Sequence, residues 1–180
     1  MKKVILILSS ILVLILIAYF GFKSYTKSFS PASQAAYQQN GLDLQVNFSR
    51  PAKKGRFVFG REQDKALVPY GKVWRTGANE ATVFKVGQKV LFGGKPLPAG
   101  EYSLWSVPGQ GDWQIILNAE SGQWGTEYND GKDFLKVNVP IRVRGEVQEM
   151  FDIYFEPRPE GVNMVLSWDQ TEAVIPILPQ

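Results

Sequence analysis

The sequence predicts an all-β fold: a single antiparallel β-sandwich, or an open barrel, preceded by one N-terminal transmembrane helix. Three observations give this prediction. Apolar and polar residues alternate with a period of two in several short segments, glycine and proline turns separate those segments, and an uncharged apolar run lies near the start. After residue 40, no segment has the apolar repeat of 3.6 residues that an amphipathic helix would show over three turns.

The uncharged run from Val4 to Phe22 is the first element, with only two serines among aliphatic and aromatic residues. As a helix it would span about 28 Å, close to the roughly 30 Å hydrocarbon core of a bilayer. We therefore expect residues 1–23 to be an uncleaved, single-pass membrane anchor. The flanking lysines slightly favour the N-terminus inside, which places the following domain outside the cytoplasm. Export after signal-peptide cleavage is the alternative, with a mature chain beginning near Ala36.

Residues 24–40 are rich in serine, glutamine and alanine, and we expect them to form a linker. Residues 41–180 are long enough for one domain with a sizeable core. The alternating segments predict strands with one buried and one solvated face at residues 42–48, 113–117, 135–141, 151–155 and 162–168.

The composition limits the chemistry of the domain. The chain has no histidine and no cysteine, which excludes Ser/His/Asp and Cys/His catalysis, disulfides and the usual histidine-based zinc and iron sites. Glu127, Asp130 and Asp133 lack the alternating oxygen ligands of a calcium loop, and we interpret them as part of a turn. We therefore expect no cofactor and no bound metal.

The basic isoelectric point belongs to the N-terminal segment. Residues 1–27 contain four lysines and no acid, so the rest of the chain has 16 basic and 17 acidic residues. Residues 28–99 carry a net charge of +7 and residues 100–180 a net charge of −8. Such opposed halves predict ion pairs within one folded domain, and we expect no nucleic-acid partner.

One segment, Tyr70 to Thr82, breaks the alternation and carries the candidate ligand-binding residues. It combines aromatic rings for stacking, a guanidinium that can bind a carboxylate and an amide that can donate and accept. With a second tryptophan downstream, the candidates are Tyr70, Trp74, Arg75, Asn79, Glu80 and Trp124. The alternative is structural: Trp74 lies in the core, Arg75 and Glu80 pair with each other or with turn carbonyls, and Gly77 supplies a positive φ.

A basic loop follows the first predicted strand. Its four cations, Arg50, Lys53, Lys54 and Arg56, could bind a phosphate or an anionic glycan. The alternative is a solvated loop, because charge runs are common at turns and no glycine cradle or helix N-terminus accompanies them.

The order and spacing of several motifs resemble a bacterial family, Domain of Unknown Function 2911. The resemblance lies in the runs Ser49 to Arg56, Leu67 to Thr82, Leu97 to Leu104 and Gln123 to Gly125, together with Phe59 and Gly60. It covers nearly everything after the linker, and only the membrane-spanning start departs from the cleavable export signal expected of the family. The resemblance implies an exported or envelope-facing bacterial domain, and it assigns no activity, cofactor or catalytic residue.

These observations favour a membrane-anchored binding or structural module for an envelope glycan or peptide. A carboxylate-dependent hydrolase is the first alternative, with Glu80 acting beside Glu101 or Glu127. A scaffold that docks partner proteins is the second, and it would expose a broad apolar patch.

Overall fold

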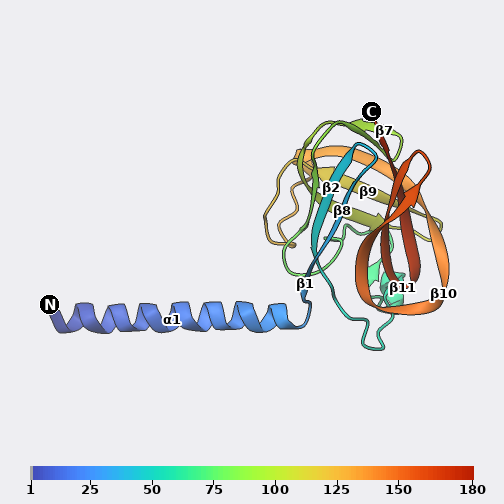
Figure 1. The fold of residues 1–180 in the computed structure, drawn as a ribbon. Helices are drawn as coiled ribbons and strands as arrows, with labels where there is room; N and C mark the ends of the chain where they lie inside the picture. The colour runs from blue at the N-terminus through green and yellow to red at the C-terminus, as the bar shows by residue number, and fades with distance from the viewer. Residues whose placement is uncertain (1) are drawn as a thin grey trace.

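The computed structural model describes residues 2–180, and the side chains of all of these except 2–7, 22–24 and 26. The described chain is mostly β, with one helix at its N-terminus and one large antiparallel sheet (Figure 1). The helix is α1 (Lys2–Ser28). The strands are β1 (Ala32–Gln39), β2 (Leu42–Ser49), β3 (Phe59–Gly60), β4 (Val68–Pro69), β5 (Thr82–Val86), β6 (Val90–Phe92), β7 (Lys95–Leu97), β8 (Gly100–Pro108), β9 (Asp112–Asn118), β10 (Asp133–Arg158) and β11 (Gly161–Pro179). Two short 3₁₀ helices, Glu62–Asp64 and Asp130–Lys132, complete the described elements.

Nine strands make up the large sheet, in the order β1-β2-β5-β8-β9-β10-β11-β6-β7. The long strand β10 joins its two halves, because it pairs with β9 up to Pro140 and with β11 from Ile141 onward. The halves face each other across one core. Rings from both halves meet there: the Phe48 and Phe151 ring centroids are 5.9 Å apart, and those of Phe84 and Phe92 are 5.6 Å apart. A separate pair of short parallel strands, β3 and β4, lies outside this sheet.

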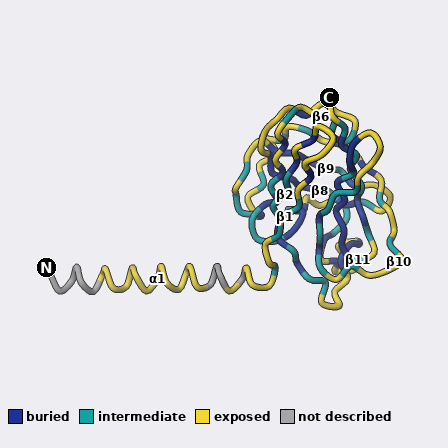
Figure 2. Tube along the Cα trace, viewed as in Figure 1, coloured by how far each residue is buried: buried dark blue, intermediate teal, exposed yellow. Residues whose placement is uncertain are grey.

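The core follows from the alternation in the sequence. In β2, every second residue from Leu42 to Phe48 is buried, and the residues between are less buried or exposed. The same alternation places one apolar face of each strand inside the domain, and Figure 2 shows the buried residues gathered between the two halves of the sheet. Burial of these faces is the main contribution to the stability of the fold.

The prediction of an antiparallel β-domain is confirmed, and all five predicted strand segments lie within β2, β9, β10 and β11. The predicted linker differs from the structure, because residues 24–40 contain the end of α1 and the whole of β1. β1 pairs with β2 over its full length, from Ala32 opposite Ser49 to Gln39 opposite Leu42. Main-chain hydrogen bonds form this edge strand, and Tyr37 is its one large apolar side chain in the core.

α1 extends away from the β-domain, and its described side chains are exposed (Figures 1 and 2). Over the described residues, no helix combines the length and the mean hydropathy required of a membrane span. Within the predicted anchor, Val4 to Phe22, the side chains of residues 4–7 and 22 lie outside the described residues. The membrane anchor therefore stays a prediction.

Candidate functional site

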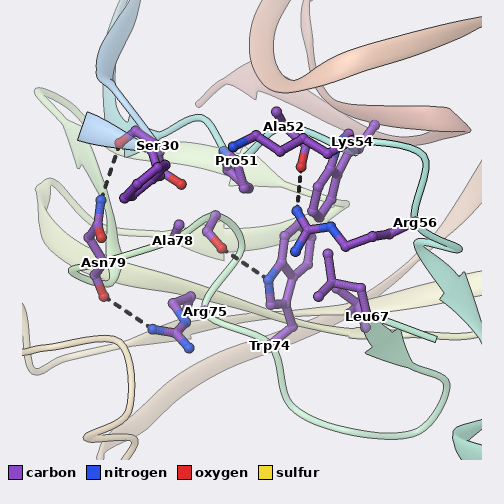
Figure 3. A pocket seen from close by; sticks show the side chains of 14 residues that line it. Ser30, Pro51, Ala52, Lys54, Arg56, Leu67, Trp74, Arg75, Ala78 and Asn79 are labelled. Carbon is purple, nitrogen blue, oxygen red and sulfur yellow. Dashed lines mark hydrogen bonds between the residues drawn. The ribbon is translucent and has the colours of Figure 1, made fainter. Parts of the chain in front are cut away.

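A pocket of about 510 Å³ lies where four separate segments meet (Figure 3). The segments are the link between α1 and β1, the loop after β2, residues 67–79, which contain β4 and the first part of the loop to β5, and the middle of β11 at Trp168. The pocket is lined by Phe29, Ser30, Pro51, Ala52, Lys54, Arg56, Leu67, Val68, Trp74, Arg75, Gly77, Ala78, Asn79 and Trp168. Members of both candidate groups, which are about 20 residues apart in the sequence, therefore share one cavity.

Trp74 forms part of the floor of the pocket. Its backbone forms an isolated bridge with Ser106 of β8, and its indole N–H donates to the Gly77 carbonyl at 3.1 Å (Figure 3). The ring stacks on Trp168 at 5.8 Å between centroids and contacts Phe59 edge to face. Trp74 is 9% exposed, so it serves mainly as a core residue whose edge reaches the pocket.

The loop after Trp74 has an unusual backbone. Thr76 and Asn79 have positive φ angles of 51° and 60°, and Gly77 has a φ of 144°. A Cβ on Gly77 would lie 2.9 Å from the Ser49 carbonyl oxygen, so this position requires glycine. A positive φ at the β-branched Thr76 is a genuine outlier of the kind that gathers at functional sites. The interactions of the Thr76 hydroxyl with Ser106 and of its carbonyl with Thr82 hold it in place.

Arg75 is held half-buried against this loop. Its one hydrogen bond to a described residue goes from Nη1 to the Asn79 carbonyl at 3.4 Å (Figure 3). The side-chain stem packs so closely on Gly125 that a Cβ there would lie 2.3 Å from the Arg75 Cδ. Burial lowers the pKa of the Arg75 guanidinium. Among the described ion pairs none involves Arg75, so this buried charge has no carboxylate to balance it.

Lys54 and Arg56 come from a tight turn on the opposite wall. The Arg56 amide donates to the Lys53 carbonyl at 3.0 Å, and Lys54 and Gly55 both have positive φ, as in a type I′ turn. Arg56 folds back over the turn and donates to the Lys53 and Ala52 carbonyls. The Lys54 ammonium lies 5.0 Å from the centre of the Phe29 ring, a cation–π contact at the pocket mouth.

Asn79 ties the pocket to the segment that follows the helix. Its side-chain amide donates to the Ser30 carbonyl at 3.2 Å (Figure 3). The same amide donates to the Ser49 hydroxyl at 3.4 Å. Its backbone carbonyl accepts from Gly125 and Arg75. Asn79 thus positions the pocket wall, and its positive φ suits an asparagine better than most other residues.

The other three residues of the first candidate group lie outside this pocket. Tyr70 packs against the core, and its amide donates to the Gly60 carbonyl. Glu80 and Trp124 form an isolated β-bridge, and the Glu80 carboxylate pairs with Lys27 of α1 at 2.5 Å. The six predicted residues therefore do not converge on one cavity: Trp74, Arg75 and Asn79 line it, and the rest do not.

Arg50 and Lys53 also have structural partners. Arg50 donates to the Phe151 carbonyl and pairs with Asp152 at 3.1 Å, and Lys53 pairs with Asp169 at 2.5 Å. These contacts hold the loop after β2 against β10 and β11. Of the basic loop, only Lys54 and Arg56 line the pocket.

Sequence reasoning missed five lining residues: Phe29, Ser30, Leu67, Val68 and Trp168. Phe29 and Ser30 lie in the segment predicted to be a linker. Trp168 is the last residue of the predicted strand 162–168 and lies in the middle of β11, and the alternation indicated only a core role for it. No local signal marks these residues, because the tertiary fold alone brings them together.

The pocket has no acidic residue in its described lining. The carboxylates considered for hydrolysis lie elsewhere in other contacts: Glu101 pairs with Lys85, and Glu127 accepts the Trp124 amide. Among the described side chains, no group of three or more acids, cysteines or histidines could hold a metal ion. The arrangement is suited to binding an anion through Lys54, Arg56 and Arg75.

Comparisons with known proteins agree with the motif resemblance. The model of the family described as "Protein of unknown function (DUF2911)" matches residues 30–177. No curated protein matches the chain, and no solved structure matches it. The matched range includes all the lining residues except Phe29.

Proposed function

The chain belongs to the DUF2911 family of proteins of unknown function, and we propose that it is a binding module whose pocket takes an anionic ligand of the cell envelope. One observation carries this proposal. The Arg75 guanidinium is half-buried in the pocket wall, has no ion-pair partner among the described residues, and shares the cavity with Lys54 and Arg56. A buried charge without a counter-charge is costly, and an anionic ligand would supply the missing partner.

An acidic sugar and a peptide carboxylate are the first ligands to consider. Both present a planar carboxylate to which a guanidinium can donate two hydrogen bonds. The Trp74 edge and the apolar lining beside it would contact the rest of the ligand. The strained backbone at Thr76 supports a functional role for this loop.

Titration of the full chain with digalacturonate and with an acetylated tripeptide tests the proposal. We expect saturable binding of at least one, followed by tryptophan fluorescence because Trp74 and Trp168 line the pocket. Arg75→Gln should weaken binding about tenfold, the loss of one charge-assisted contact. Arg158→Gln is the matched control, since this exposed arginine lies at the hairpin between β10 and β11. Equal binding of the amidated tripeptide and of a neutral disaccharide would contradict the proposal.

We also propose that α1 anchors the domain in the membrane, with the domain outside the cytoplasm. The uncharged run from Val4 to Phe22 and the flanking lysines support this. Alkaline carbonate extraction of bacterial membranes should leave the full chain in the pellet, and external protease should digest the domain in spheroplasts. A soluble mature chain beginning near Ala36 would contradict the anchor.

A further inference from the structure

The lining of the pocket has two chemically different parts. Three cations, Lys54, Arg56 and Arg75, supply its charge. Its apolar members include Phe29, Leu67, Trp74 and Trp168. A free phosphate or a small acidic sugar would use the cations and leave much of this apolar surface in water. A ligand that combines an anionic group with a hydrocarbon chain would use both parts.

The apolar part continues to the mouth of the pocket. Phe29 is 49% exposed and Leu67 is 40% exposed, although both line the cavity. Phe57, whose carbonyl accepts the Leu67 amide, is also exposed. The Phe29 ring meets Tyr25 of α1 edge to face at 5.0 Å. Exposed aromatic and aliphatic side chains beside cations are typical of surfaces that contact a membrane interface.

The pocket is also close to the proposed membrane surface. The apolar run ends at Phe22, α1 ends at Ser28, and Phe29 is already part of the pocket. Six helical residues extend about 9 Å, and the head-group layer on each side of a bilayer is about 5 to 8 Å deep. Two contacts hold the link between α1 and β1 against the loop before β5. Lys27, just before the link, pairs with Glu80, and the Asn79 amide donates to the Ser30 carbonyl.

We infer that the anion bound in this pocket is the head group of a membrane lipid, whose hydrocarbon chain leaves across Phe29 and Leu67. This inference rests on the proposed function and narrows its ligand to an anion joined to a hydrocarbon chain. Three acids lie on the neighbouring segments, and each has a partner. Glu80 pairs with Lys27, Asp169 pairs with Lys53, and the Glu149 carboxylate accepts the backbone amide of Lys54. No acid of the described lining competes with the head group for the three cations.

The test uses the full chain in micelles of a neutral sugar-headed detergent. Three probes are titrated and followed by tryptophan fluorescence: dihexanoyl phosphatidylglycerol, dihexanoyl phosphatidylcholine and glycerol phosphate. The two lipids share their chains and enter the micelle alike, so a difference between them reports the head group. We expect phosphatidylglycerol to bind at least about tenfold more tightly than either of the other probes.

Substitutions separate the two parts of the pocket. Arg75→Gln and the exposed Lys54→Gln should each weaken phosphatidylglycerol binding about tenfold, whereas Arg158→Gln should leave it unchanged. Leu67→Ser should weaken binding of the lipid several-fold and leave binding of glycerol phosphate unchanged. Val143→Ser, at an exposed apolar site on β10, is the matched control.

The possible outcomes distinguish this inference from the proposed function. If glycerol phosphate binds as tightly as phosphatidylglycerol and Leu67→Ser has no effect, the inference is wrong and the anion-binding proposal stands. If phosphatidylcholine binds as tightly as phosphatidylglycerol, the pocket does not select an anionic head group and the inference is wrong. If no anion binds, including digalacturonate and the tripeptide, both the inference and the proposed function are wrong.

Discussion

Two regions of the domain hold arginine side chains against the folded chain, and they differ in what surrounds the positive charge. On β10 and β11, the carboxylate of Glu172 is 3% exposed and accepts hydrogen bonds from Arg142, Arg144 and Tyr154. Arg142 also donates twice to Glu156. We name Arg142, Arg144, Tyr154, Glu156 and Glu172 the β10–β11 network. Each charge in it has an opposite charge beside it.

Arg75 shows the other arrangement. It is half-buried like Arg144, yet its hydrogen bond goes to a backbone carbonyl and no described ion pair reaches it. Burial lowers the pKa of Arg75, whereas hydrogen bonds to Glu172 raise the pKa of Arg144. The comparison indicates that arginines of the network stabilise the fold. Under the proposed function, Arg75 is retained at a cost to stability because it binds the anion.

Removing the central acid of the network should have the largest effect. Glu172→Ala leaves Arg144 and Tyr154 without their shared acceptor and Arg142 with Glu156 alone. We expect a loss of about 2 to 3 kcal/mol in unfolding free energy, below the 3 to 5 of a fully buried pair because both arginines are partly exposed. Urea unfolding measures it. Glu160→Ala, on the exposed β10–β11 turn, is the control and should change stability by less than about 0.5 kcal/mol. Equal effects of the two variants would contradict the stabilising role of the network.

Crowding the stem of Arg75 should have the next largest effect. In Gly125→Ala the new Cβ would lie 2.3 Å from the Arg75 Cδ and 2.6 Å from the Asn79 carbonyl oxygen. We expect a loss of about 1 to 3 kcal/mol, as for other overpacked sites, together with weaker anion binding. Gly111→Ala, where the Cβ meets nothing within 4 Å, is the control. Unchanged anion binding in a destabilised Gly125→Ala protein would show that the position of Arg75 does not matter for the ligand.

Acid should weaken the network through Glu172. Burial alone would raise the pKa of the Glu172 carboxyl, but hydrogen bonds from Tyr154, Arg142 and Arg144 outweigh it and hold the pKa below the ordinary 4.5. A lowered folded-state pKa stabilises the protein above the unfolded-state pKa, and this stability is lost as the pH falls through the folded-state value. Unfolding free energy should therefore decline below about pH 4.5, by at most about 1.4 kcal/mol per pH unit for this carboxyl.

A glutamine at this position sharpens the comparison. Glu172→Gln cannot titrate, so its stability should decline less steeply with acid than that of the wild type. Asp133 retains a similarly lowered pKa, since hydrogen bonds from Lys136, Tyr128 and Asn118 outweigh the effect of its burial, so some decline remains. Identical slopes for the two proteins would show that Glu172 does not control the acid response.

The sequence predicted the fold better than the site, and particular residues show why. Alternation revealed β2, β9, β10 and β11 because each buries a row of large apolar side chains. It missed β1, because serine, glutamine and alanine give little contrast in polarity between alternate residues. Backbone pairing with β2 forms this strand. For the site, residue chemistry selected Trp74, Arg75 and Asn79 in one segment and Lys54 and Arg56 in another.

That these two segments face one pocket is a property of the tertiary fold. The link after α1 and the middle of β11 complete the pocket with Phe29 and Trp168, which have no local signature. Sequence reasoning also could not separate the four cations of the basic loop. Arg50 and Lys53 resemble Lys54 and Arg56 in the sequence, and only the positions of Asp152 and Asp169 distinguish them.

Neutralising Arg75 should have the smallest effect on stability and is the sharpest test of the comparison. Arg75→Met keeps an unbranched stem against Gly125 and removes a half-buried charge without a described counter-charge. We expect the unfolding free energy to stay the same or rise by up to about 1 kcal/mol, because the desolvation cost disappears with the charge. Anion binding should weaken about tenfold in the same protein, as for Arg75→Gln. A decrease in stability of more than about 1 kcal/mol, with anion binding retained, would place Arg75 with the arginines of the β10–β11 network as a structural residue. Substituting a structural arginine removes contacts on which the fold depends, so it cannot raise the unfolding free energy. A rise in unfolding free energy together with weaker anion binding would therefore show that Arg75 is not a structural residue.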